Sequence, residues 1–173
     1  MILRQTTIPE VEVVMDIIDD GKAYLKSEGI DQWQHGYPNA KTIQQDIHDG
    51  QAYVLEKNGE IIATAMISFL GEETYASIEG PGWLADVPYA VLHRVAVASD
   101  LKGQGIAAAL IAKTEELCQQ KGITSIRIDT HEKNASMQQL LKKTGFVYCG
   151  IIHLIPGEGS EAGIRLAFEK ILS

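Results

Sequence analysis

Cysteines and long apolar runs are scarce in this chain. Among 173 residues the only cysteines are Cys118 and Cys149, too few for a disulfide framework. Both fall on apolar faces of predicted elements, so two buried free thiols are expected. No apolar run approaches the roughly 20 residues that a membrane span requires, and the first residues carry no signal-peptide core. These features predict a cytoplasmic protein without a membrane partner.

Basic residues are also in short supply. The net charge of -8 at pH 7 argues against nucleic acid or an anionic membrane as a partner. Residues 1–90 hold 15 Asp and Glu against 5 Lys and Arg, whereas residues 91–173 hold 8 against 10. An acidic half joined to a basic half suits an enzyme that binds an anion on one side and a cation on the other. Solvated charges distributed by chance explain it equally well.

The remaining composition is that of an ordinary globular protein, and the length predicts one domain over residues 1–173. Thr7 and Glu10 have the spacing of a capping box, which places a first helix after them, and a second helix is expected over 41–48. Strand-like runs at 51–56 and 61–69 flank a hairpin turn. The remaining pattern predicts strands at 89–97, 123–129, 146–154 and 163–171, with helices at 105–121 and 135–144. This order indicates an α/β fold, a mixed sheet with helices on both faces.

The most informative segment joins the strand ending at Val97 to the helix beginning near Gly105. It reads Lys102-Gly103-Gln104-Gly105-Ile106-Ala107. Glycines allow positive φ and close approach of the backbone to an anion, and the first helical turn offers unpaired N–H groups and a positive dipole end. Lys102 adds a positive charge. We therefore predict a turn that binds the phosphates of a nucleotide-derived cofactor; the alternative is a connection that merely turns the chain.

The same turn fits a second cofactor class. Gly103-x-Gly105-x-x-Ala108 matches the dinucleotide fingerprint, and Asp129 ends the next strand, where a ribose-binding acid would lie. An NAD(P)-binding oxidoreductase is thus one alternative. Against it, a long N-terminal half precedes the turn and only one more helix follows, which leaves no room for a second mononucleotide-binding half.

Two motifs resemble those of the GCN5-related N-acetyltransferase (GNAT) superfamily. Motif A of that family, Gln/Arg-x-x-Gly-x-Gly/Ala, binds the pyrophosphate of acetyl-coenzyme A, and this chain has Lys102-x-x-Gly105-x-Ala107. Asn134-Ala135-Ser136-Met137, followed by Leu140-Leu141 and Gly145-Phe146, resembles motif B. The resemblance covers residues 2–171. It implies a mostly antiparallel central sheet with a parallel pair at the cofactor cleft, and acetyl transfer from acetyl-coenzyme A to a primary amine of a small acceptor.

The resemblance also implies roles for individual residues. The backbone of Val95, Ala96 and Val97 pairs with pantetheine, and the side chain of Asn134 hydrogen-bonds the same arm. The pyrophosphate is bound by the N–H groups of Gly103, Gln104, Gly105, Ile106 and Ala107, beside Lys102. Lys142 or Lys143 would reach the adenosine 3′-phosphate, although lysines on a helix are more commonly solvated. The tyrosine that often protonates the leaving thiolate is replaced by Leu141, which leaves a non-catalytic coenzyme A-binding sensor as another alternative.

Proton transfer needs other candidates. An alkylamine with a pKa of about 10.4 lies roughly 3 units above neutral pH, so deprotonation costs about 4 kcal/mol, and a positioned base lowers that barrier. His93 is the candidate base, because histidine titrates at about pH 6.5 and its strand resembles that of aralkylamine acetyltransferases. A histidine satisfied within the sheet is equally consistent. Tyr148 is the candidate acid, and the N–H of Val95 or a neighbour would bind the oxyanion.

The acceptor site is expected to include the first two helices, residues 33–38 and residues 157–163. Trp33 and Tyr37 could hold a cationic amine by cation–π attraction, although loop packing explains them equally well. Glu79 is a second candidate for a base or an acceptor contact. No metal is expected, since His93, His131 and His153 lack ligand spacing. A homodimer through an exposed final strand, Gly163–Ile171, is the remaining expectation; the acceptor itself stays open.

Overall fold

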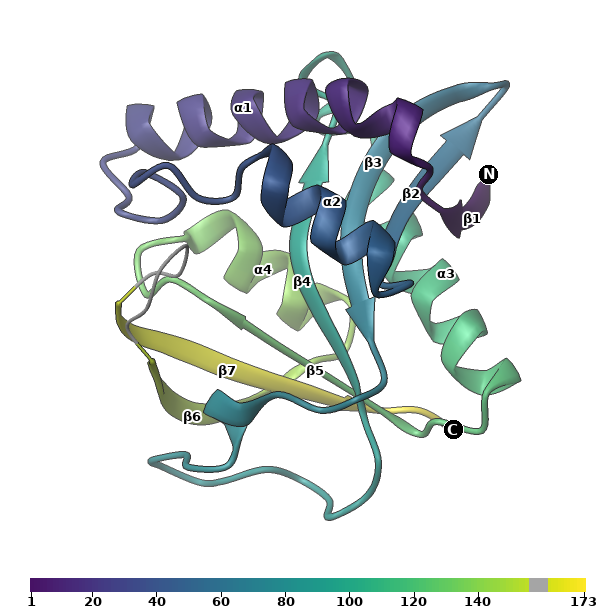
Figure 1. The fold of residues 1–173 in the computed structure, drawn as a ribbon. Helices are drawn as coiled ribbons and strands as arrows, with labels where there is room; N and C mark the ends of the chain where they lie inside the picture. Colours follow the sequence, from purple (N-terminus) through teal and green to yellow (C-terminus); the bar gives the residue numbers. More distant parts are fainter. Residues whose placement is uncertain (156–161) are drawn as a thin grey trace.

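A mixed sheet of seven strands forms the centre of the protein (Figure 1). The computed structural model describes residues 1–155 and 162–173. The strand order is β1-β2-β3-β4-β5-β7-β6, and among the recorded pairs β4 and β5 alone run parallel. The strands are β1 (Ile2–Gln5), β2 (Ala52–Lys57), β3 (Glu60–Ser68), β4 (Ala90–Val97), β5 (Ser125–Thr130), β6 (Val147–Leu154) and β7 (Gly163–Ile171). This architecture confirms the predicted fold class.

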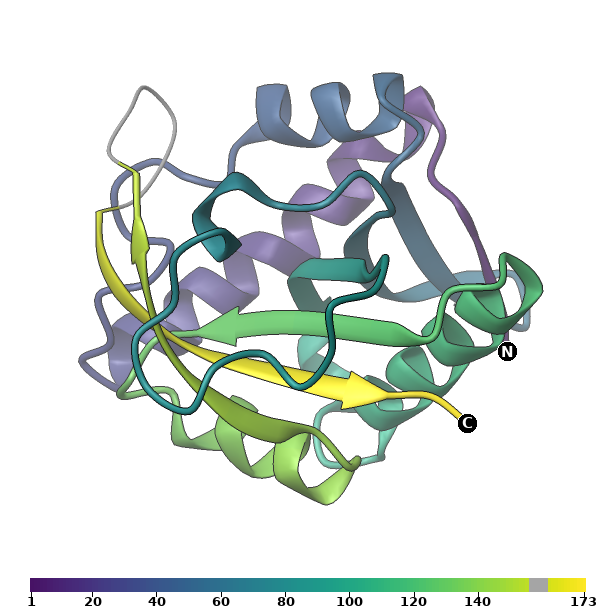
Figure 2. The same ribbon diagram turned by 90° about the horizontal axis from the view of Figure 1, so that it is seen from below.

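Helices cover both faces of the sheet, as predicted (Figures 1 and 2). They are α1 (Val11–Ser27), α2 (Ala40–His48), α3 (Ile106–Gln120) and α4 (Ala135–Lys143). Val14 and Ile18 of α1 pack with α2 against one face, and Leu110 of α3 and Leu141 of α4 pack against the other. Each buried aliphatic side chain contributes about 1.5–3 kcal/mol. Within the described residues, no helix combines the length and the apolar character needed to cross a membrane.

The N-terminal strand β1 was not expected from the sequence. We predicted that the chain would enter a helix directly, but Ile2–Gln5 pairs antiparallel with β2, with Leu3 opposite Leu55. A four-residue edge strand has too little alternation to be recognised alone. Arg4 fixes it in place, donating to Glu56 at 3.0 Å and to Glu10 at 2.6 Å. The predicted capping box is confirmed, because the Thr7 N–H donates to the Glu10 carboxylate at 2.8 Å.

The long connection between β3 and β4 crosses the sheet face formed by β5 and β7 (Figure 2). A buried ion pair holds this connection against the sheet. Glu169 of β7, with no exposed surface, lies 3.1 Å from Arg127 of β5 and accepts from the Leu84 N–H. The Arg127 guanidinium lies between the rings of Trp83 and Tyr89, 4.2 and 3.9 Å from their centroids. This packing fixes the short 3-10 turn η2 (Glu73–Tyr75) against the sheet.

The final strand is not an edge strand, and the prediction that it is exposed was wrong. β7 lies between β5 and β6 and pairs antiparallel with both. Strand order cannot be read from a hydrophobic pattern, because that pattern describes the two faces of a strand and not its lateral neighbours. A dimer contact through Gly163–Ile171 therefore loses its basis.

Both cysteines are buried free thiols, which confirms the expectation from the sequence. Cys118 belongs to α3 and points into the core. Burial raises the pKa of its thiol to about 11, because an apolar surrounding disfavours the charged thiolate.

Candidate functional site

A bulge in β4 distorts the centre of the sheet. In the pairing of β3 with β4, Thr64 lies opposite Ala96 and Met66 opposite His93. Two residues of β4, Arg94 and Val95, therefore oppose one residue of β3. Arg94 has a φ of 52°, which a residue with a side chain adopts rarely outside such irregularities.

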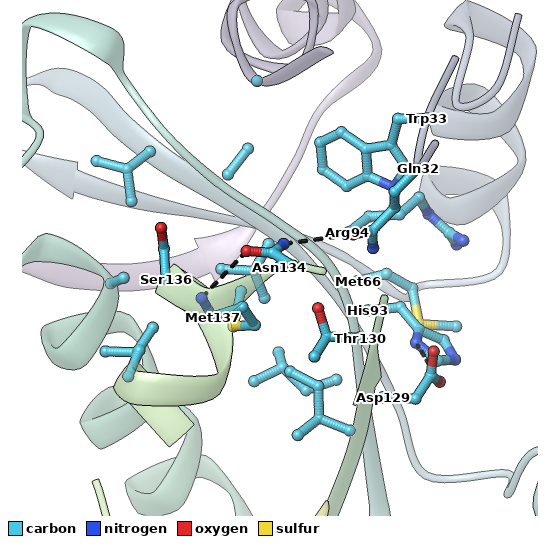
Figure 3. Close-up of a pocket in the computed structure, with 18 of the residues that line it drawn as sticks. Gln32, Trp33, Met66, His93, Arg94, Asp129, Thr130, Asn134, Ser136 and Met137 are labelled. Carbon is cyan, nitrogen blue, oxygen red and sulfur yellow. Dashed lines mark hydrogen bonds and ion pairs between the residues drawn. The ribbon is translucent and has the colours of Figure 1, made fainter. Parts of the chain in front are cut away.

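The parallel strands β4 and β5 pair only at their beginnings and then part. Their recorded pairs are Ala90 with Ile126 and Val91 with Arg127. A cavity of about 1070 Å³ opens where they separate, in the upper range for ligand-binding pockets. Its wall includes residues from β4, β5, α1, the turn before α3 and α4, many of which Figure 3 shows. The strand residues predicted to pair with pantetheine, Val95, Ala96 and Val97, line it.

The predicted phosphate turn forms part of the cavity wall. Gly103 and Gly105 have φ values of 80° and 76°, so both adopt the left-handed conformation that glycine tolerates. Helix α3 begins at Ile106, and the N–H groups of its first turn have no partner within the helix. Of residues 102–107, all but Gln104 line the cavity. The turn thus has the backbone features of an anion site.

Lys102 lies against helix α1. Its Nζ atom is 4.1 Å from the centroid of the Tyr24 ring, a cation–π contact. The Tyr24 hydroxyl is in turn 2.9 Å from the Ser136 hydroxyl of α4. Lys102, Tyr24 and Ser136 all line the cavity, so α1 and α4 are joined across it next to the phosphate turn.

Asn134 is the N-cap residue of α4. Its Oδ1 accepts from the Met137 N–H at 3.2 Å, a contact that stabilises a helix start by about 1 kcal/mol. Its Nδ2 donates to Gln32 Oε1 at 3.3 Å (Figure 3), which uses one of its two N–H groups. Farther along the helix, Lys143 lines the cavity and Lys142 does not.

His93 and Asp129 face one another across the parting strands (Figure 3). His93 Nδ1 lies 3.7 Å from Asp129 Oδ2, and the two side chains are 20% and 10% exposed. Tyr75 of η2 donates its hydroxyl to the same Oδ2 at 2.6 Å, and its ring meets the His93 ring edge-on with centroids 6.0 Å apart. Burial raises the pKa of the Tyr75 hydroxyl well above its usual range, and the Asp129 charge adds to the effect, so Tyr75 remains a proton donor in this contact.

A second charged cluster surrounds Arg94. Its guanidinium donates to both oxygens of Asp46 on α2, at 2.9 and 2.7 Å, and to the Tyr37 hydroxyl at 2.6 Å. Burial raises the pKa of the Asp46 carboxyl, although Arg94 opposes that shift. The Arg94 guanidinium also lies 5.9 Å from the Tyr37 ring centroid, so this ring already contacts a cation of the protein.

Some of the predicted acceptor residues line the cavity and others do not. Trp33 and Tyr37 line the cavity, and Trp33 is at the same time a core residue of the α1–α2 cluster. Glu79 does not reach the cavity wall: its carboxylate is 70% exposed and lies 3.1 Å from His153. Of the predicted loop 157–163, residues 157–161 lie outside the described part of the chain.

The candidate acid Tyr148 is not brought to the cavity. It lies on the edge strand β6, 41% exposed, with its ring edge-on to Phe168 at 5.7 Å. Leu141, where the GNAT pattern often has tyrosine, is fully buried in the core and offers no proton. The tyrosines of the described chain that line the cavity are Tyr24 and Tyr37.

Four residues of the site were not assigned these positions by sequence reasoning: Tyr75, Asp46, Arg94 and Asp129. Asp129 was considered only as a ribose-binding acid. Its place opposite His93 had no readable signal, because the register that pairs Ala90 with Ile126 is decided by tertiary pairing and not by the strand ends. No sequence signal pointed to Tyr75, because this residue lies in the irregular connection between β3 and β4. Among the described residues, no group of three or more His, Cys, Asp or Glu side chains could hold a metal ion.

Comparison with known proteins decides the family. Residues 18–146 match the sequence model of the family described as acetyltransferase (GNAT) family. The chain belongs to the GNAT acetyltransferases. It is therefore an acyltransferase by family, and the resemblance noted in the two motifs is confirmed.

Solved structures agree with this assignment. A GNAT-family acetyltransferase from Streptococcus agalactiae is 33% identical, with a TM-score of 0.86, over 99% of this chain and 95% of that chain. A GNAT-family acetyltransferase from Listeria monocytogenes has 22% identity and a TM-score of 0.74, over 99% and 94% of the two chains. Ribosomal-protein-alanine N-acetyltransferase from Brucella melitensis has 20% identity and a TM-score of 0.65, over 99% and 100%. The latter two show the shared fold. No curated protein matches the chain.

GNAT membership also bears on the oxidoreductase alternative. A dinucleotide-binding fold requires a largely parallel sheet with the ligand at a reversal of strand order, whereas the one parallel pair recorded here is β4 with β5. Gly103, Gly105 and Ala108 match the dinucleotide fingerprint in sequence, but the sheet around them is not that of a dinucleotide-binding fold.

Proposed function

We propose that this GNAT acyltransferase transfers an acetyl group from acetyl-coenzyme A to the primary amine of a small acceptor by direct attack. The observation that carries the proposal is a single cavity whose wall contains both the Gly103–Gly105 turn and His93. Phosphate binding at the turn and proton transfer at the histidine are the two functions that such a reaction requires.

Cofactor binding follows from the backbone around the cavity. The N–H groups from Gly103 to Ala107 would bind the pyrophosphate at the N-terminus of α3. The freed edge of β4, where it parts from β5, would pair with the pantetheine amides through Val95 to Val97. Lys143 would meet the adenosine phosphate. In this arrangement the thioester end of the cofactor approaches the bulge and His93.

The chemistry itself is one displacement. The neutral amine nitrogen attacks the thioester carbonyl carbon, an N–H group of the β4 bulge at Val95 stabilises the oxyanion, and the C–S bond then breaks to release coenzyme A. The neutral amine must lose one proton as it becomes an amide. His93 is the basic side chain on the cavity wall with the chemistry for that role.

The proposal is tested by mixing the protein with acetyl-coenzyme A and a panel of amines, polyamines, amino acids and peptides. Release of free thiol and the mass of the acetylated amine are both measured. Substitution His93→Gln, which keeps a polar side chain of similar length, is expected to lower kcat about 100-fold, as for a general base. Calorimetry with coenzyme A and with NAD(P) provides the binding controls.

Three outcomes are distinguishable. Acetylated product with loss of activity in His93→Gln supports the proposal. Tight coenzyme A binding without turnover on any amine would instead identify a sensor, the alternative that Leu141 raises. Binding of NAD(P) but not of coenzyme A would overturn both readings.

A further inference from the structure

The geometry around His93 assigns functions to two further residues. His93 and Asp129 each lie two residues beyond the last recorded pair of β4 and β5, Val91 with Arg127. They therefore occupy equivalent places at the point where the strands part, one on each side of the opening. The 3.7 Å between His93 Nδ1 and Asp129 Oδ2 is a direct consequence of this register.

Asp129 differs from the other buried acids of the protein. Asp46 lies 2.7 Å from Arg94 and Glu169 lies 3.1 Å from Arg127, so each has a guanidinium partner. Within residues 1–155 and 162–173, the basic group within 4.0 Å of Asp129 is His93 and its hydrogen-bond donor is Tyr75. A carboxylate that is 10% exposed is costly to leave without a counter-charge, and the counter-charge available to it is a protonated His93.

Tyr75 fixes the carboxylate. Its side chain is buried, with 2% exposure, and packs against Trp83 with ring centroids 5.1 Å apart. The Trp83 ring is in turn covered by Arg127. The connection between β3 and β4 thus carries a rigid hydroxyl to Oδ2 at 2.6 Å, a short charge-assisted bond.

We propose that Tyr75 and Asp129 are positioning residues that orient His93 and stabilise its protonated form during acetyl transfer. The inference rests on the proposed function. His93 keeps one proton on Nδ1, toward Asp129, and its Nε2 takes the proton that the amine loses as the C–N bond forms. When the C–S bond breaks, Nε2 returns this proton to the departing sulfur, so one amine proton becomes the thiol proton. His93 then serves as base and acid in turn, and the residue at position 141 need not be tyrosine.

Other charged groups near His93 do not supply the same effect. Asp46 faces it from α2, but Asp46 is paired with Arg94, the neighbour of His93 on β4. Glu72 and Glu73 line the same cavity from the β3–β4 connection, and no ion pair within 4.0 Å joins either one to His93 in the described chain. Asp129 is therefore the acid expected to control this histidine.

The decisive variant is Asp129→Asn, which keeps an oxygen for the Tyr75 hydroxyl and removes the charge. An opposite charge within about 4–6 Å favours the charged form of a titratable group. We expect the acidic limb of kcat/KM to move toward lower pH and kcat to fall about 10-fold, with KM for acetyl-coenzyme A unchanged. Tyr75→Phe is expected to act in the same direction with a smaller effect. Asp16→Asn, which removes an exposed charge from α1, is the control and should leave the profile unchanged.

A double variant separates positioning from a purely structural role. In the His93→Gln background, Asp129→Asn should cost no further rate, because its partner is already absent. A further 10-fold loss in that background would show that Asp129 acts through the fold, and would overturn the proposal.

The titration of the His93 ring, followed by NMR in the free protein, needs no activity. Its midpoint should move toward lower pH in Asp129→Asn, and an unchanged midpoint in both Asp129→Asn and Tyr75→Phe would refute the proposed roles of Asp129 and Tyr75. If the midpoint moves in the variants while the wild-type protein acetylates no amine, the electrostatic interaction between Asp129 and His93 is supported and the acetyltransferase proposal fails. If the wild-type protein acetylates an amine but the substitutions change neither the midpoint nor the acidic limb, only the proposed roles of Tyr75 and Asp129 are refuted. Tyr75→Phe provides the same readouts should Asp129→Asn fold poorly.

Discussion

Replacing Gly105 by alanine separates what the phosphate turn contributes to stability from what it contributes to ligand binding. Gly105 has a φ of 76°, and a Cβ atom added there has no neighbour within 4 Å. Gly59, in the turn between β2 and β3, has a φ of 79° and equally open surroundings. Gly59 does not line the cavity, so the two positions form a matched pair.

The expected loss of stability is therefore the same for both variants. An L-residue in the left-handed region costs about 1–2 kcal/mol, and neither substitution adds a steric clash. Urea unfolding should show a decrease of about 1 kcal/mol in the free energy of unfolding for Gly105→Ala and for Gly59→Ala. A much larger loss in either one would mean that the turn has to rearrange.

Coenzyme A binding should distinguish the two variants. Gly105 lines the cavity at the start of α3, so we expect a methyl group added there to obstruct the approach of a phosphate to the N–H groups of the helix. We expect Kd measured by calorimetry to rise at least 10-fold, about 1.4 kcal/mol, in Gly105→Ala and to stay at the wild-type value in Gly59→Ala. Equal affinities in the two variants would refute phosphate binding at this turn.

Two further predictions concern stability. The hydrogen bonds from Arg4 lower the pKa of Glu10 to about 2 from an ordinary 4.5, so this carboxylate stabilises the fold above about pH 4.5 and loses that effect as the pH falls toward 2. Glu10→Gln should cost about 1 kcal/mol at pH 7, because solvent screens the pair, and the difference from wild type should vanish near pH 2; a constant difference would contradict this cause. Glu169→Gln leaves the buried Arg127 without its counter-charge and should cost about 3 kcal/mol by urea unfolding. The double variant Arg127→Met/Glu169→Met should recover part of that loss, and a double variant less stable than the single one would argue against charge burial as the cause.

The sequence alone determined most of the helices and strands and the conformation of the turn at Gly103 and Gly105. Helices α1 to α4 and most strands follow from apolar spacing and from local signals such as the Thr7–Glu10 capping box. The turn at Gly103 and Gly105 could also be recognised, because positive φ at a helix start is a local requirement. These features depend on neighbours along the chain, and for that reason they are legible without a structure.

Only the tertiary structure decided how the end of the cavity at His93 is assembled. The bulge at Arg94 and the parting of β4 from β5 arise from pairing between distant segments. They bring Asp129 beside His93, and the β3–β4 connection brings Tyr75 to both. The same sheet order places Tyr148 on an edge strand away from the cavity. The alternation of residues along a strand determines the face of the sheet on which a side chain lies, but a bulge shifts that alternation. Which strands become neighbours is decided only by the pairing of segments that are distant in sequence.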